Sequence, residues 1–64
     1  MHRYYIAYYK GETDPAFFGL TKSPDPEADD EGAKAVAQAF GEEEYEKPLV
    51  KLLRVTGTKE VPLF

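Results

Sequence analysis

The fold prediction for this chain starts from residues 3–10, which read RYYIAYYK. Four tyrosines in eight residues favour a β-strand, because aromatic side chains pack well on a pleated, half-buried surface. Successive side chains of a strand point to opposite faces, so each face of this strand receives two of the rings. One face carries Tyr4, Ile6 and Tyr8, and the other carries Arg3, Tyr5, Ala7 and Tyr9. We expect the face that contains Ile6 to be the buried one.

A second strand is predicted after a short loop. Residues 11–14, GETD, are typical of a turn, and Asp14 precedes Pro15, a position at which the helical conformation is disfavoured. Residues 16–22, AFFGLTK, then predict a strand that forms an antiparallel hairpin with the first. Gly19 inside this strand indicates a bulge or a close backbone approach.

A helix is predicted over about residues 28–40. Ala33, Val36, Ala37 and Phe40 follow the spacing i, i+3, i+4 and i+7, which places them on one apolar stripe. The alanines in this stripe indicate that the helix approaches the sheet closely.

The ends of this helix carry recognisable signals. Asp25 followed by Pro26 is one candidate N-cap, and Asp29, one turn later, is the other. Gly41 fits the left-handed residue that commonly ends a helix.

Residues 48–56, PLVKLLRVT, fit either a helix or a strand by periodicity. We predict a strand, because a two-stranded hairpin with one helix is hardly stable in water and a third strand corrects this. Residues 59–63 form either a short edge strand or a tail, and Pro62 restricts any strand there to an edge.

These elements predict a single small domain over residues 1–64, of the α+β class. The expected architecture is a two-layer ββαβ(β) domain, in which one helix covers one face of an antiparallel sheet of three to four strands. At 64 residues the chain buries only about 60 % of its unfolded surface, which makes independent stability marginal. The absence of cysteine excludes disulfides and thiolate zinc sites.

The net charge of −4 is unevenly distributed. Residues 1–24 carry three bases and two acids, a net +1, whereas residues 25–46 carry nine acids and one base, a net −8. Residues 47–64 carry four bases and one acid, a net +3. Asymmetry of this kind bears on association and solubility rather than on fold.

Catalysis is poorly served by this composition. Ser23 is the single serine and His2 the single histidine, so neither a serine nor a cysteine nucleophile with a supporting base is expected. The acids fall in turns and at helix ends, and a chain this small offers little volume for a cleft. We predict a protein that is not an enzyme and uses no cofactor and no metal.

The sharpest functional feature is the tyrosine-rich first strand. If the Ile6 face is buried, Tyr5 and Tyr9 lie with Arg3 on a sheet face that the chain has no second helix to cover. An exposed aromatic patch beside arginine is typical of a protein contact, and Arg54 joins this surface if the first and third strands are neighbours. The predicted binding surface is therefore Arg3, Tyr5, Tyr9 and Arg54.

Two partners fit such a surface. The first is a protein, either another protein of the host or a second copy of this chain. The second is nucleic acid, whose bases stack on aromatic rings of a sheet, although basic residues are few. No apolar run reaches the ~18 residues of a membrane-spanning helix, and the start Met1-His2-Arg3 lacks the apolar stretch of a signal peptide, so we expect a cytoplasmic protein without a membrane partner.

The order of parts also resembles a group of short proteins. An aromatic strand, Phe17-Phe18-Gly19, an acidic-capped helix and the strand that begins Pro48-Leu49-Val50 resemble the small uncharacterised ββαβ proteins of phage and mobile elements. The first half is more distantly similar to HicB-type antitoxins, in which an aromatic hairpin precedes a helix. The resemblance implies a small regulatory or binding protein, but it transfers no functional residues.

Overall fold

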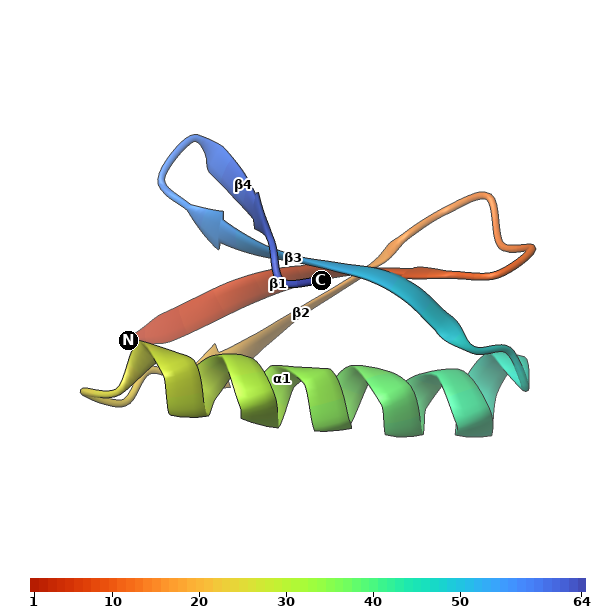
Figure 1. Cartoon of the computed structure of the whole chain (residues 1–64), viewed down its shortest axis with the longest axis horizontal. Helices are drawn as coiled ribbons and strands as arrows, with labels where there is room; N and C mark the ends of the chain where they lie inside the picture. Colours follow the sequence, from red (N-terminus) through yellow and green to blue (C-terminus); the bar gives the residue numbers. More distant parts are fainter.

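The structure is a computed structural model that describes residues 1–64. Its elements are β1 (His2–Tyr9), β2 (Ala16–Thr21), α1 (Pro26–Phe40), the π-helical turn η1 (Gly41–Tyr45), β3 (Leu49–Thr56) and β4 (Lys59–Pro62). They form two layers, with α1 lying along one face of a twisted four-stranded sheet (Figure 1). The predicted α+β class and antiparallel sheet are confirmed.

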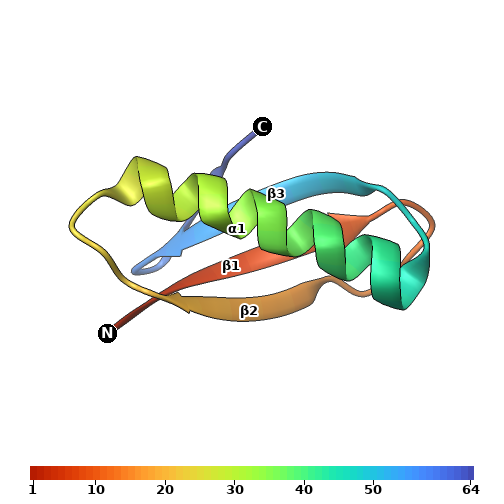
Figure 2. The same ribbon diagram turned by 90° about the horizontal axis from the view of Figure 1, so that it is seen from below.

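The strand order is β2-β1-β3-β4, and every neighbouring pair is antiparallel. The first strand of the chain is therefore central: Tyr5 pairs with Phe18 on one side and with Arg54 on the other. Seen from the helix side, α1 crosses β1 obliquely between β2 and β3 (Figure 2), whereas β4 curls away from the helix (Figure 1). The two edges of the sheet are β2 and β4.

The expectation about which sheet face packs against the helix is wrong, although Ile6 itself is buried, at 6 % exposure. Tyr5, Ala7 and Tyr9 face α1 and are only 1 %, 0 % and 3 % exposed, whereas Tyr4 is 58 % exposed on the opposite face. The tyrosines fit the core because their hydroxyls reach polar partners there. The Tyr5 hydroxyl donates to Asp30, and that of Tyr9 donates to the carbonyl of Ala37 at 2.7 Å. Tyr5 and Tyr9 are therefore part of the fold rather than an exposed contact surface.

Small residues line the side of α1 that meets the sheet. Ala33 and Ala37 are fully buried, and Gly41 continues their line at the same spacing of four. A Cβ placed on Gly41 would lie 2.5 Å from Cε1 of Tyr9. Val36 and Phe40, expected in the buried stripe, are 43 % and 40 % exposed, because the helix turns its smallest side chains toward the tyrosine rings.

Asp25 is the N-cap of α1, and its carboxylate accepts from the backbone N–H groups of Glu27 and Ala28. At the other end the predicted stop is wrong. Gly41 keeps a right-handed φ of −61°, and η1 carries the chain on to Glu46, which is the left-handed residue with φ 54°. Gly41 is glycine because the Tyr9 ring occupies the space that a side chain would need.

The π-helical turn places one more ring on this end of the core. Tyr45 lies 4.9 Å from Tyr9 and 5.5 Å from Phe40, measured between ring centroids. Such tilted and edge-on aromatic pairs are favourable beyond the area that they bury.

The two helical glycines provide a matched test of this packing. We expect Gly41→Ala to lower the free energy of unfolding by about 1–3 kcal/mol, because its methyl group overpacks the Tyr9 ring and the Lys47 carbonyl. Gly32→Ala meets no atom within 4 Å and should raise it by about 1 kcal/mol through helix propensity. Urea denaturation of the two variants measures both effects, and equal effects would contradict the close approach at Gly41.

The corrected sheet faces are tested by truncating the tyrosines. Tyr5→Ala and Tyr9→Ala should each cost about 3–5 kcal/mol, as for other large buried rings. A chain of this size has only roughly 0.05–0.15 kcal/mol of stability per residue, so we expect both variants to lose cooperative thermal unfolding. Tyr4→Ala should keep it. The reverse pattern in circular dichroism melts would show that the assigned faces are exchanged.

Candidate functional site

All four residues of the predicted binding surface lie on the helix side of the sheet. Arg3, Tyr5 and Arg54 come together beside the first turns of α1, whereas Tyr9 lies near the other end of that helix. None of them is exposed: the two tyrosines are buried and the two arginines are half-buried. The structure thus confirms that Arg54 neighbours Tyr5 across the sheet and overturns the open surface that they were expected to form.

Asp29 ties this group to the start of the helix. Its carboxylate accepts from Arg3 Nε at 2.5 Å, from the Ser23 hydroxyl at 2.6 Å and from the Ser23 backbone N–H at 3.0 Å. Arg3 also donates to the Ser23 carbonyl at 3.3 Å. Asp29, which the sequence offered as a helix cap, instead joins the connector before α1 to β1.

Asp30 makes the equivalent link to the middle of the sheet. It forms an ion pair with Arg54 on β3 and accepts a hydrogen bond of 3.1 Å from the Tyr5 hydroxyl on β1. We call Arg3, Tyr5, Ser23, Asp29, Asp30 and Arg54 the polar cluster. No buried side-chain polar atom of the chain is left without a partner, so this cluster satisfies its own hydrogen-bonding groups.

The pKa values of two cluster residues agree with a structural role, in which the cluster links α1 to the sheet. Burial, followed by the hydrogen bond to Asp30, raises the pKa of Tyr5 to about 12. The hydrogen bonds from Ser23 and Arg3 lower the pKa of Asp29 to about 2. At neutral pH Tyr5 therefore stays protonated and Asp29 stays ionised. Burial also raises the pKa of Tyr9.

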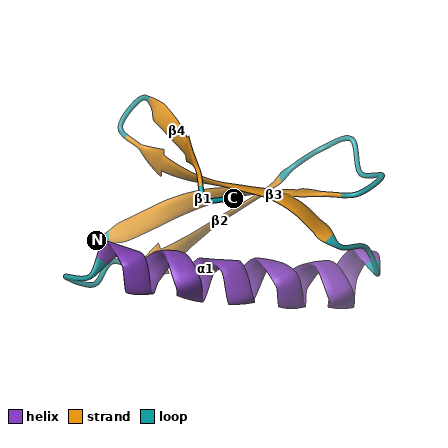
Figure 3. Ribbon diagram, viewed as in Figure 1, coloured by secondary structure: helices purple, strands orange, loops and turns teal.

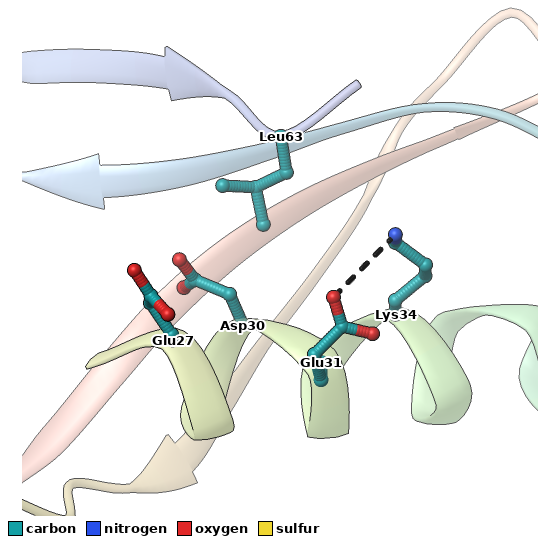
Figure 4. A pocket seen from close by; sticks show the side chains of 5 residues that line it. All are labelled: Glu27, Asp30, Glu31, Lys34 and Leu63. Carbon is teal, nitrogen blue, oxygen red and sulfur yellow. Dashed lines mark ion pairs between the residues drawn. The ribbon is translucent and has the colours of Figure 1, made fainter. Parts of the chain in front are cut away.

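A hollow of about 240 Å³ opens beside the polar cluster and is lined by Glu27, Asp30, Glu31, Lys34 and Leu63. Leu63 points from the C-terminal segment toward α1, and Lys34 turns to Glu31 at 3.8 Å (Figure 4). Asp30 is already engaged by Arg54 and Tyr5. No three acidic or histidine side chains of the chain gather in a way that could hold a metal ion.

The opposite face of the sheet has no helix over it (Figure 3). Phe17 and Tyr4 are 72 % and 58 % exposed there, on neighbouring strands. They line, with Gly19 and Val55, an open and mainly apolar hollow of about 310 Å³. The Tyr4 ring lies against Gly19, where a Cβ would come within 3.0 Å of it. The close approach predicted at Gly19 is thus a ring covering a glycine, and the exposed aromatic surface lies on this face.

Exposed apolar residues continue on the other side of β2. A small groove lined by Ala16, Phe17, Phe18, Val36 and Phe40 lies between that strand and α1, and all five lining residues are apolar. We call strand β2 together with the exposed side chains of Tyr4, Phe17, Val36 and Phe40 the β2 surface. It wraps around one edge of the sheet and contains no charged residue.

Sequence reasoning missed this surface because Tyr4 was assigned to the core. One signal pointed to it: the six residues Ala16–Thr21 contain no charge, whereas the other edge strand, Lys59–Pro62, contains a lysine, a glutamate and a proline. Exposed edge strands normally carry such blocking residues. An unblocked edge is therefore unusual and can be read from the sequence once the strand order is known.

At least three of the eight basic residues are engaged by other side chains of the fold. Arg3 and Arg54 are held by Asp29 and Asp30, and Lys51 lies over the ring of Tyr8, 5.6 Å from its centroid. A phosphate-binding surface needs several free cations close together.

No protein-family model, curated protein or solved structure matches this chain. The structure contains no helix with both the length and the apolar character needed to cross a bilayer. What the protein does has to be inferred from its own surfaces.

The polar cluster generates a prediction about pH. Because the pKa of Asp29 is about 2 in the folded protein and ordinarily 3.8, the unfolded chain takes up a proton first as the pH falls. The stability that Asp29 provides is complete above about pH 4 and is lost as the pH drops toward 2. We expect Asp29→Asn to be less stable than the wild type at pH 7 and to approach it at pH 2.

The control for this experiment is Glu12→Gln, which removes an exposed loop charge with the same change in net charge. Its difference from the wild type should vary little over the same range in urea titrations at each pH. If Asp29→Asn and Glu12→Gln gave the same pH dependence, the ion pair with Arg3 would not contribute to stability.

Proposed function

We propose that this chain is a non-catalytic protein-binding module and that the β2 surface is its contact site. The observation that carries the proposal is the exposure of Phe17 and Tyr4, two large rings side by side on an uncovered sheet face. Contiguous apolar surface of this kind is uncommon on proteins that act alone and typically marks an interaction site. The site predicted from the sequence, Tyr5 and Tyr9, is replaced by Tyr4 on the other face of the same strand and by Phe17 on the neighbouring strand β2.

The chemistry of the β2 surface favours an apolar or extended protein partner. Its rings can fill pockets of a partner, as aromatic anchors do in other interfaces. Its edge strand can add main-chain hydrogen bonds by strand addition, one of the recurring ways in which sheets bind peptides. Strand β2 and the four exposed side chains of this surface carry no charge of their own that would oppose an apolar contact.

Nucleic-acid binding, including an antitoxin-like role, is the second candidate. It is supported by the two exposed rings, on which unpaired bases can stack, and is disfavoured by the net charge of −4 and by the engagement of Arg3 and Arg54 in ion pairs. We therefore rank protein binding first.

The contact site is tested by comparing captured proteins. We expect the tagged chain to retain a partner that Tyr4→Ala/Phe17→Ala loses, with at least a tenfold weaker affinity when the purified partner is titrated by calorimetry. Val50→Ala is the matched control, since Val50 is 52 % exposed on β3, away from β2. Partners kept by the double variant and lost by Val50→Ala would refute the assignment of the site to β2.

The two candidates differ in their response to salt. Fluorescence anisotropy with labelled single-stranded oligonucleotides of mixed sequence at low salt should show no binding by the full chain. Binding that weakens steeply as salt rises would instead support the nucleic-acid candidate, because phosphate contacts release counterions.

A further inference from the structure

We propose that the partner of the β2 surface is a second copy of this chain, and that two β2 strands pair antiparallel across a two-fold axis into one continuous eight-stranded sheet. The proposal rests on the proposed function, whose site it uses, and adds the identity of the occupant and the register of the contact.

The backbone of β2 has hydrogen-bonding groups free for this pairing. The Lys22 N–H donates to the Met1 carbonyl at 2.9 Å, so the groups of Lys22 point toward β1. Inward and outward groups alternate along an antiparallel strand. Those of Leu20, Phe18 and Ala16 therefore also point toward β1, and those of Phe17, Gly19 and Thr21 point to the free edge.

Only one edge of the sheet can pair in this way. At the other edge, β4 has only four residues, Pro62 has no N–H to donate, and the charges of Lys59 and Glu60 disfavour pairing with another strand. Strand β2 has six residues without charge or proline. A strand that meets its own copy brings like charges near each other, and β2 carries none to repel.

One pairing register between the two β2 strands uses all the outward backbone N–H and C=O groups of Phe17, Gly19 and Thr21, and it is centred on Gly19. In it Gly19 faces Gly19 of the second copy, and Phe17 faces Thr21 of the second copy at both ends of the pairing. The Tyr4 ring already covers Gly19, so two Tyr4 rings flank the axis on the open face. The Phe17 rings stand beside them, and the four rings form one apolar layer.

Charge at the ends of β2 favours a second copy over an unrelated strand. Asp14 lies just before β2 and Lys22 just after it. Antiparallel pairing about Gly19 places Lys22 opposite Ala16 of the second copy, two residues from its Asp14, so these opposite charges fall at the same end of the pairing. The two-fold axis forms this pair twice, so the strand and its flanks are complementary to themselves.

The size of the contact predicts a weak dimer. Stable interfaces bury about 1,200–2,000 Å² in total. Aromatic side chains bury about 150–250 Å² each when fully covered, and the rings of the β2 surface are only partly exposed. We expect a dissociation constant in the micromolar range rather than a permanent dimer.

Analytical ultracentrifugation of the full chain, from about 10 µM to about 1 mM, tests the association. We expect a reversible shift from monomer to dimer mass. Thr21→Lys should weaken this association at least tenfold, because it places a charge opposite Phe17 of the second copy, whereas Val50→Lys should not. Circular dichroism of both variants establishes that they are folded.

The register is tested by disulfide cross-linking between introduced cysteines. The chain has no cysteine of its own, so every disulfide formed must join introduced residues. Directly opposed residues in such a pair lie about 5.5 Å apart between Cα atoms, a distance that a disulfide can span. Phe17→Cys mixed with Thr21→Cys should form a mixed disulfide dimer on oxidation several times faster than either variant alone. Val50→Cys is the control.

The possible results either support or overturn the β2–β2 dimer. A monomer at about 1 mM overturns the dimer, and the protein-binding function then survives only if partner capture still depends on Tyr4 and Phe17. A dimer that Thr21→Lys does not weaken, or that Val50→Cys cross-links equally well, places the contact elsewhere and overturns the pairing of β2. A dimer with the expected cross-link supports both the occupant and the register.

Discussion

The structure depends on the close approach of α1 to the tyrosines of β1. Ala33, Ala37 and Gly41 present almost no side chain to the sheet, so Tyr9 fits beneath the helix and donates its hydroxyl to the Ala37 carbonyl at 2.7 Å. Because side chains alternate along β1, this one contact also decides the other face. Burying Tyr5 and Tyr9 turns Tyr4 and Tyr8 away from the helix.

Much of the fold follows from the sequence by pattern alone. The helical spacing, the Asp25-Pro26 start and the β-rich segments predict the α+β class, and the need for a third strand identifies residues 48–56 correctly as β3. The face of β1 that meets the helix was predicted wrongly, because aromatic residues occupy both faces and alternation gives no preference. The deciding factor is side-chain size: the helix presents small side chains to the sheet, so the sheet face beneath it must carry large rings to fill the space.

For the candidate site, the sequence predicted which residues are neighbours but not the sheet face on which they lie. Arg3, Tyr5 and Arg54 are neighbours, as expected from pairing the first and third strands, but their partners Asp29 and Asp30 draw them to the helix side. Those two acids precede Ala33 by three and four residues, so they begin the buried side of α1. Part of the −8 segment is thus neutralised inside the fold, and the remaining acids of α1 and η1 stay in solvent.

The central position of β1 has a consequence for synthesis of the chain. Its partners are β2, which follows within a few residues, and β3, which ends only at Thr56. Residues nearer the N-terminus leave the ribosome first, so one side of β1 stays unpaired in the β1–β2 hairpin until β3 has emerged. Long-range pairing of this kind slows folding. The nascent hairpin, with bare strands on both sides, is the stage at which this protein is most exposed to chaperones and to aggregation.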